Sequence, residues 1–316
     1  MADLGRGAKG LAALGILAAG VAAGALAERL ATRRLQQREF VGIESATGIT
    51  HEVITDDGVA LNVVEEICDV PAGAPTVIFS HGYGLSLDSW PGQREALRGV
   101  ARVVLWDQRG HGGSERGVPG TTIERLGTDL GCVLDAVAPQ GAVVLVGHSM
   151  GGMTIMALAD QRPEIFGSRV RGVALLATSA GGIADVDLGL PRPVARLAHR
   201  VAPSIGAALE SEGPVSALIE RARRSSSDLG LLITRAYAFG STVPPDGTRI
   251  VADLINGTPV DVLADLLPAL QGHDKTEALH VLDRCDLLVM VGDSDLLTPV
   301  GHSYEIVRHT PSAELV

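Results

Sequence analysis

The chain is poor in cysteine and in positive charge. Its only cysteines are Cys68, Cys132 and Cys285, which are widely spaced and form no CxxC pair, so neither a zinc site nor a disulfide framework is predicted. We expect three buried free thiols. The formal net charge is -11. Because phosphate binding requires a basic surface, this charge argues against nucleic acid as a partner.

Apolar residues, in contrast, are plentiful. They make up 46% of the 316 residues, whereas charged residues make up 20%, so the chain can form a sizeable core. The length fits one α/β domain that carries an insertion.

Residues 10–27 contain no charged side chain. As a helix this segment would be roughly 27 Å long, just short of a bilayer core of about 30 Å. Arginines are richer after it than before it, which favours an uncleaved membrane anchor with the catalytic part facing the cytoplasm. The alternatives are a cleaved signal ending at Ala25-Leu26-Ala27, followed by secretion, and a soluble or peripheral helix.

Short apolar runs of the buried-strand type alternate with helical patterns along the rest of the chain. This alternation predicts an α/β fold with a mostly parallel sheet and helices on both faces. Asp56-Asp57-Gly58, between two β-like runs, predicts a hairpin. The predicted strands are 51–55, 59–67, 76–80, 100–106, 142–146, 170–177 and 287–291.

More than a hundred residues with little strand character separate the last two of these strands. Prolines punctuate several helix-like segments there, and we interpret residues 183–265 as an inserted helical cap. The predicted domains are therefore an N-terminal segment and linker (1–40), a first core part (41–182), the cap (183–265) and a second core part (266–316).

A serine between glycines follows the strand-like run 143–146, and a helical pattern starts at Met150. Gly147-His148-Ser149-Met150-Gly151 in this context predicts a nucleophile elbow, in which Ser149 attacks an acyl group. The oxyanion would be stabilised by the backbone N–H of Met150 and by that of Tyr83 in "SHGYG". We expect His81, beside Gly82, to be a structural hydrogen-bonding residue.

Four motifs in order now support a resemblance: His81-Gly82-Tyr83-Gly84, "DQRGHGGSE" at 107–115, Gly147 to Gly151, and "GDSDLLTP" at 292–299. With them, residues 50–316 resemble the α/β-hydrolase superfamily, in its cap-bearing esterase/lipase branch. The apolar N-terminal segment is similar to that of actinobacterial members. The resemblance implies an eight-stranded sheet, no cofactor or metal, and a triad in the order serine, acid, histidine.

By this resemblance the acid falls on Asp295, with Asp293 as the alternative. Its role is to orient the histidine and stabilise its charged form. The histidine must follow the acid, and only His302 and His309 do so. Both lie in a predicted helix, and "SAELV" is typical of the start of the next strand, so we expect a truncated chain whose last strand, helix and triad histidine are missing. The alternatives are recruitment of His302 or His309, and a pseudoenzyme.

The sequence thus predicts a serine hydrolase that cleaves small-molecule carboxylic esters, lipid-like or with small acyl groups. A serine nucleophile argues against epoxide hydrolase or dehalogenase chemistry. A cofactor-free perhydrolase or haloperoxidase and a non-catalytic protein of this fold are the alternatives. We expect structural roles for Asp107, Arg109 and His111, a solvated cap face for 221–224, and a surface turn for His273, with pocket lining as its alternative.

Overall fold

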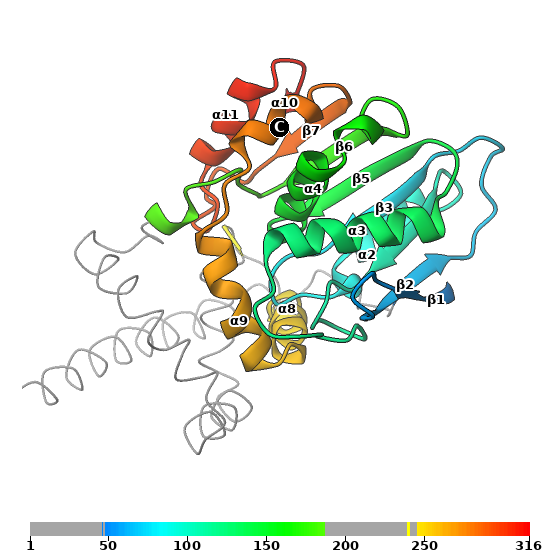
Figure 1. Ribbon diagram of the computed structural model, residues 1–316, viewed down its shortest axis with the longest axis horizontal. Helices are drawn as coiled ribbons and strands as arrows, with labels where there is room; N and C mark the ends of the chain where they lie inside the picture. The colour runs from blue at the N-terminus through cyan, green and yellow to red at the C-terminus, as the bar shows by residue number, and fades with distance from the viewer. Residues whose placement is uncertain (1–45, 47, 187–238, 241–244) are drawn as a thin grey trace, which may run out of the picture.

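The computed structural model describes residues 46, 48–186, 239–240 and 245–316, and its centre is an eight-stranded sheet (Figure 1). The strand order is β1-β2-β4-β3-β5-β6-β7-β8. The strands are β1 (Gly48–Ile54), β2 (Ala60–Glu66), β3 (Thr76–Ser80), β4 (Arg102–Trp106), β5 (Val143–His148), β6 (Val170–Leu176), β7 (Asp286–Met290) and β8 (Glu314–Leu315).

The sheet is parallel from β4 to β8 and antiparallel at the β1–β2–β4 end. The predicted hairpin is confirmed, since Ile54 pairs with Ala60 across the Asp-Gly turn. The two residues of β8 confirm that "SAELV" begins a strand. The mostly parallel α/β sheet expected from the alternation of elements is therefore present.

Helices cover both faces of the sheet (Figure 1). One face packs against α3, α4, α10 and α11, and the other packs against Leu87 of η1, Trp90 and the end of α2 at Leu97. The described helices are α2 (Pro91–Leu97), α3 (Ile123–Val137), α4 (Met150–Gln161), α8 (Pro245–Gly257), α9 (Val260–Gln271), α10 (Leu279–Leu282) and α11 (Val300–His309), with 3₁₀ turns η1 (Leu87–Ser89), η2 (Pro163–Ile165), η3 (Ile183–Asp185) and η4 (Thr276–Ala278).

Neighbouring residues on one strand show why both faces need helices. On β3, Ile78 belongs to the core under α3 and α4, whereas Val77 and Phe79 belong to the core on the opposite face. All five residues of this strand are buried, as the continuous apolar run predicted. Because β3, β5 and β6 are parallel neighbours, their carboxyl ends lie together at one edge of the sheet.

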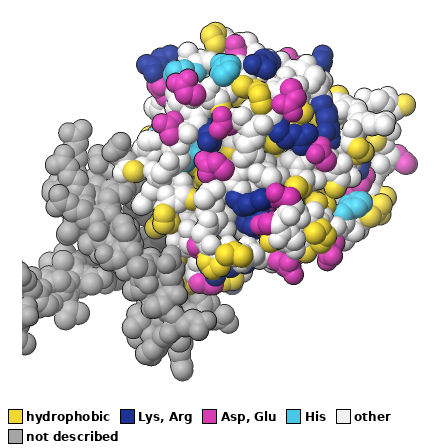
Figure 2. Space-filling view, viewed as in Figure 1, with side chains coloured by type: hydrophobic (Ala, Val, Ile, Leu, Met, Phe, Trp, Pro, Cys, Tyr) yellow, Lys and Arg dark blue, Asp and Glu magenta, His cyan; other side chains and the backbone are white. Residues whose placement is uncertain are grey.

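Part of the predicted cap is described. It contains η3, α8 and α9, and α9 continues to Gln271, past the predicted boundary at residue 265. The remainder of 183–265 and the whole N-terminal segment, including 10–27, lie outside the described residues. Within the described ranges no helix combines the length and the apolar character that a membrane span needs. On the face shown in Figure 2, basic side chains lie among acidic ones.

Candidate active site

The predicted nucleophile lies between β5 and α4. Ser149 has φ 51° and ψ -117°, a conformation that costs a non-glycine residue of order 1–3 kcal/mol. The strand ends at His148 and the helix begins at Met150, so the serine occupies the sharp turn between them. This is the strand–turn–helix arrangement that the motif predicts.

Two glycines make this turn possible. A Cβ on Gly147 would lie 2.5 Å from the carbonyl oxygen of Gly151, and one on Gly151 would lie 2.0 Å from the carbonyl oxygen of Ser80. Real side chains do not make such contacts with backbone. The motif glycines are therefore required by the packing of α4 against its own strand and against β3.

Both proposed oxyanion donors have free backbone N–H groups. Within the described part of the chain, neither Tyr83 N–H nor Met150 N–H donates to a protein acceptor. The loop after β3 and the elbow approach closely, because a Cβ on Gly82 would lie 2.8 Å from Nδ1 of His148. The Tyr83 hydroxyl donates to the carbonyl of Leu263 on α9 (2.5 Å), which joins this loop to the cap.

Two buried histidines hold the same loop. His81 Nδ1–H donates to Gly82 O (2.8 Å), and its Nε2 accepts Gln108 N–H (2.9 Å), so the structural role expected for His81 is confirmed. His111 Nδ1–H donates to Arg109 O (3.0 Å), and its Nε2 accepts Gly84 N–H (3.2 Å). Burial lowers the pKa of His81 to about 4 and that of His111 to about 3, so both rings are neutral near pH 7.

The side chain of Gln108 connects this loop to α4. Its Nε2 donates to His81 O (2.6 Å), and its Oε1 accepts the hydroxyl of Thr154 (2.6 Å). Gln108 lies in the "DQRGHGGSE" motif, but that motif does not identify its partners, and Thr154 belongs to none of the four motifs. What marks both side chains as part of the site is that they are fully buried and polar, and only the fold reveals this burial.

The predicted acid lies in the loop after β7. Asp295 Oδ1 accepts the N–H groups of Leu297 and Thr298 (both 2.8 Å), and Oδ2 accepts the Thr298 hydroxyl (2.9 Å). The alternative, Asp293, is exposed, and among the described residues it accepts a hydrogen bond only from the hydroxyl of Ser294 (3.0 Å). A carboxylate oriented by its own loop suits the role of an orienting acid, so this geometry favours Asp295.

Neither histidine that follows the acid reaches the triad partners. His302 Nδ1 lies 2.7 Å from Ser179 Oγ, and His309 Nε2 lies 3.1 Å from Glu305 on the surface of α11. Within the described residues, no histidine forms a hydrogen bond to Ser149 or Asp295. The structure therefore does not bear out recruitment of His302 or His309 as the base.

Two expectations about other residues are corrected. His273 is not in a surface turn: it is 5% exposed, and its Nε2 donates to the carbonyl of Ser179 (3.2 Å), because the end of α9 packs onto the segment after β6. Only Cys285 of the three thiols is buried, while Cys68 and Cys132 are half-buried. Residues 221–224 lie outside the described residues.

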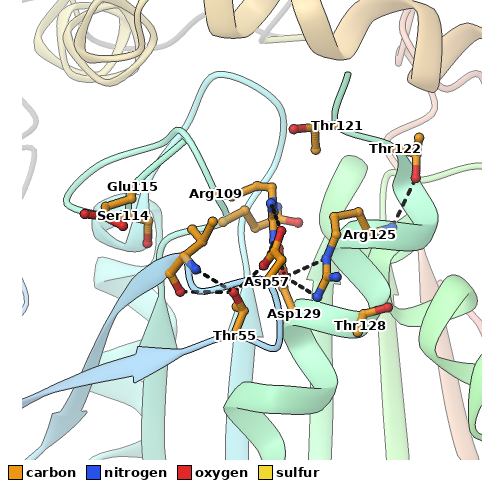
Figure 3. A network of polar contacts seen from close by, with 12 residues as sticks. Thr55, Asp57, Arg109, Ser114, Glu115, Thr121, Thr122, Arg125, Thr128 and Asp129 are labelled. Atoms are coloured by element: carbon orange, nitrogen blue, oxygen red, sulfur yellow. Dashed lines mark hydrogen bonds and ion pairs between the residues drawn. The ribbon is translucent and has the colours of Figure 1, made fainter. Parts of the chain in front are cut away.

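The structural roles expected for the loop after β4 are confirmed. Asp107 accepts the N–H groups of Leu87 and Gly113 (both 2.8 Å). Arg109 lies between Asp129 on α3 and Asp57 at the hairpin turn (Figure 3). No cluster of three or more His, Cys, Asp or Glu that could hold a metal ion occurs among the described residues.

Comparison with known proteins identifies the family. The α/β hydrolase fold family matches residues 75–316. The chain belongs to this family. It is 30% identical over 253 residues to the "putative carbamate hydrolase RutD" of Caulobacter sp. (strain K31), a match that covers 76% of this chain and 80% of the relative.

Two further relatives are similar over different lengths. The "bifunctional esterase/perhydrolase DCH" of Acinetobacter calcoaceticus is 41% identical over 95 residues, which is 30% of this chain and 34% of the relative. A crystal structure of a hydrolase from Pseudomonas aeruginosa PA01 has 26% identity and a TM-score of 0.62, covering 85% of this chain and 90% of that one. In three other curated relatives the matched segment spans between 26% and 39% of their length.

Proposed function

We propose that the protein is a serine hydrolase that cleaves carboxylic esters through an acyl-enzyme at Ser149. The observation that carries this proposal is the strained Ser149 elbow together with the backbone N–H groups of Tyr83 and Met150, which have no acceptor in the part of the chain that the structure describes. A hydroxyl in such a turn faces the substrate, and unpaired amides beside it are suited to a developing oxyanion.

The proposed reaction proceeds in two halves. Ser149 Oγ attacks the ester carbonyl carbon while its proton passes to a histidine base, and the carbonyl oxygen becomes an oxyanion held by the N–H groups of Tyr83 and Met150. The tetrahedral intermediate then expels the alcohol, which takes up the proton. Water attacks the acyl-enzyme by the reverse route. Asp295 orients the base, and none of the described histidines is assigned that role.

Apolar packing supports an ester over a highly charged substrate. Beside the elbow, Met150 and Met153 of α4 pack with Val262, Leu266 and Leu270 of α9. Because these side chains are at most 8% exposed, they hold the cap helix against α4 directly after the nucleophile, and an apolar cap beside the site favours an acyl group over a charged one. The serine itself is unsuited to the covalent step of an epoxide hydrolase or dehalogenase.

Labelling with a fluorophosphonate probe tests this proposal. Wild-type protein that includes the histidine base is expected to become labelled at Ser149 and to hydrolyse short p-nitrophenyl esters, and Ser149→Ala is expected to lose both properties. If that protein is folded but resists the probe and all esters, the proposal is wrong and a non-catalytic protein of this fold is favoured.

A perhydrolase is the second candidate. It is supported by the similarity to the bifunctional esterase/perhydrolase over 95 residues. In such a reaction hydrogen peroxide replaces water as the nucleophile toward the acyl-enzyme and yields a peracid. Adding peroxide to the ester assay and measuring peracid distinguishes the two activities.

We also propose that residues 10–27 associate with a membrane and leave the catalytic part in the cytoplasm. The uncharged length and the following arginines support this arrangement. The test is to fuse, at residue 40, reporters that are active on only one side of the membrane. A reporter that is active in the cytoplasm should give a signal, and activity of a reporter on the outer side would refute the proposal.

A further inference from the structure

We propose that Thr178 is a positioning residue for the oxyanion hole, acting through the peptide group that joins Ser149 to Met150. This inference rests on the proposed function, because it assigns a role to the Met150 N–H. Thr178 lies just after β6, belongs to none of the four motifs, and is 1% exposed.

The segment after β6 is strained next to the strained nucleophile. Among the described residues, Ser149 (φ 51°) and Ala177 (φ 45°) are the two non-glycine residues with positive φ. Such conformations persist only where surrounding contacts enforce them. Ala177 N–H donates to the carbonyl of Met290 on β7 (2.7 Å), which is one such contact.

The turn at Ala177 places its two neighbours on the backbone of the nucleophile. Ser149 N–H donates to the carbonyl of Leu176 (2.9 Å), and the Thr178 hydroxyl donates to the carbonyl of Ser149 (2.7 Å). The N–H and the C=O of Ser149 are therefore both held by residues that flank Ala177. The positive φ of Ala177 matters here because the turn brings the Leu176 carbonyl and the Thr178 hydroxyl to the backbone of Ser149.

The peptide plane transmits this constraint to the oxyanion hole. A trans peptide is rigid and planar, so fixing the C=O of Ser149 fixes the direction of the Met150 N–H on its opposite side. The same carbonyl also accepts N–H from Gly152 (2.9 Å) and Met153 (3.3 Å), and Thr178 supplies the shortest of these bonds. Donation to a carbonyl also polarises its peptide and strengthens the N–H as a donor.

Gly152 shows that this contact needs space. A Cβ at Gly152 would lie 2.6 Å from Thr178 Oγ1 and 2.7 Å from its Cγ2, so a side chain there would displace the threonine. The second glycine after Met150, which lies outside the five-residue elbow motif, is thus explained by the threonine that reaches across from β6.

Thr178→Val removes the hydroxyl and keeps the shape. We expect the rate constant for fluorophosphonate labelling of Ser149, and kcat for a p-nitrophenyl ester, to fall about tenfold with KM unchanged. This loss is smaller than the roughly hundredfold loss that follows removal of an oxyanion donor, because the Met150 N–H is displaced but not deleted. Thr178→Ser, which retains a hydroxyl, is expected to recover most of the rate.

Thr310→Val is the matched control. Thr310 is also fully buried, and its hydroxyl also donates to a backbone carbonyl, that of Ile306 (2.9 Å), after α11. Both variants are expected to shift the urea midpoint by similar amounts, but only Thr178→Val should slow labelling. If the wild type is labelled and Thr178→Val is labelled at the same rate, the role of Thr178 is wrong while the proposed function stands. The same conclusion follows if Thr310→Val is slowed as much as Thr178→Val. An unlabelled wild type overturns the proposed function as well.

Discussion

Replacing Asp129 by Asn is expected to destabilise the protein by about 3 kcal/mol, at the lower end of the cost of breaking a buried ion pair. Asp129 is fully buried on α3, and its carboxylate accepts Nε and Nη2 of Arg109 (2.6 and 2.7 Å; Figure 3). Asn preserves the volume but removes the charge, which leaves the 3% exposed Arg109 guanidinium with Asp57 as its remaining partner. Asp57 is 39% exposed, so solvent screens it and it compensates only in part.

Urea unfolding at pH 7 measures this loss. With an m-value of about 3 kcal/mol/M, the midpoint should fall by about 1 M. Asp135→Asn is the control on the same helix, because Asp135 pairs with Arg162 (2.8 Å) and Arg169 (2.7 Å) while 52% exposed. That variant should lose about 0–1 kcal/mol. Equal losses in the two variants would refute the reasoning that burial sets the cost.

Three other outcomes are expected. Gly151→Ala should destabilise the protein by about 3 kcal/mol or more by urea unfolding, since its Cβ would meet Ser80 O at 2.0 Å, whereas Gly92→Ala, in open space on α2, should be nearly neutral. Tyr83→Phe should cost about 1 kcal/mol by loss of the bond to Leu263, and an unchanged Tm would contradict that role. The folded-state pKa values of His81 and His111, about 4 and about 3, lie below the unfolded value near 6.5. The two neutral rings therefore contribute fully to the free energy of unfolding above pH 6.5, and this contribution declines as the pH falls. Equal urea midpoints at pH 7 and pH 4.5 would refute this pH dependence.

The sequence predicted those parts of the site that depend on short stretches of chain. The Ser149 elbow needs glycines two residues to either side, and this requirement is visible in five residues because the colliding atoms belong to one strand–turn–helix unit and the adjacent strand. Strand positions were also predictable, since a fully buried parallel strand such as β3 is a continuous apolar run. The hairpin was predictable because its turn signal, Asp-Gly between two β-like runs, is also contained in a short stretch of chain.

The parts that depend on distant segments were not predictable. Thr178 reaches Ser149 across 29 positions, and Gln108 reaches Thr154 across 46. No sequence pattern marks Thr178 or Thr154 as buried, and the motif that contains Gln108 does not show which residue its side chain contacts, so only the fold reveals these contacts. His273 was assigned to a surface turn because it precedes Asp274 near the end of the predicted cap, whereas its ring is buried against the segment after β6.

The charge of the groups around the oxyanion loop follows a simple electrostatic rule. Groups that accept hydrogen bonds from this loop or hold it in place are neutral: Nε2 of His111 accepts Gly84 N–H, and Gln108 bonds to the carbonyl of His81. A carboxylate in place of His111 would also accept the Gly84 N–H, but its negative charge would oppose the oxyanion through a low-dielectric interior, and a carboxylate in place of Gln108 could not donate to the carbonyl of His81. The carboxylates of this region are paired or surrounded by donors: Asp129 on α3 is paired with Arg109, and Asp107, directly after β4, accepts the N–H groups of Leu87 and Gly113. Burial that keeps both histidines neutral therefore lets them orient the loop without weakening the stabilisation of negative charge beside Ser149.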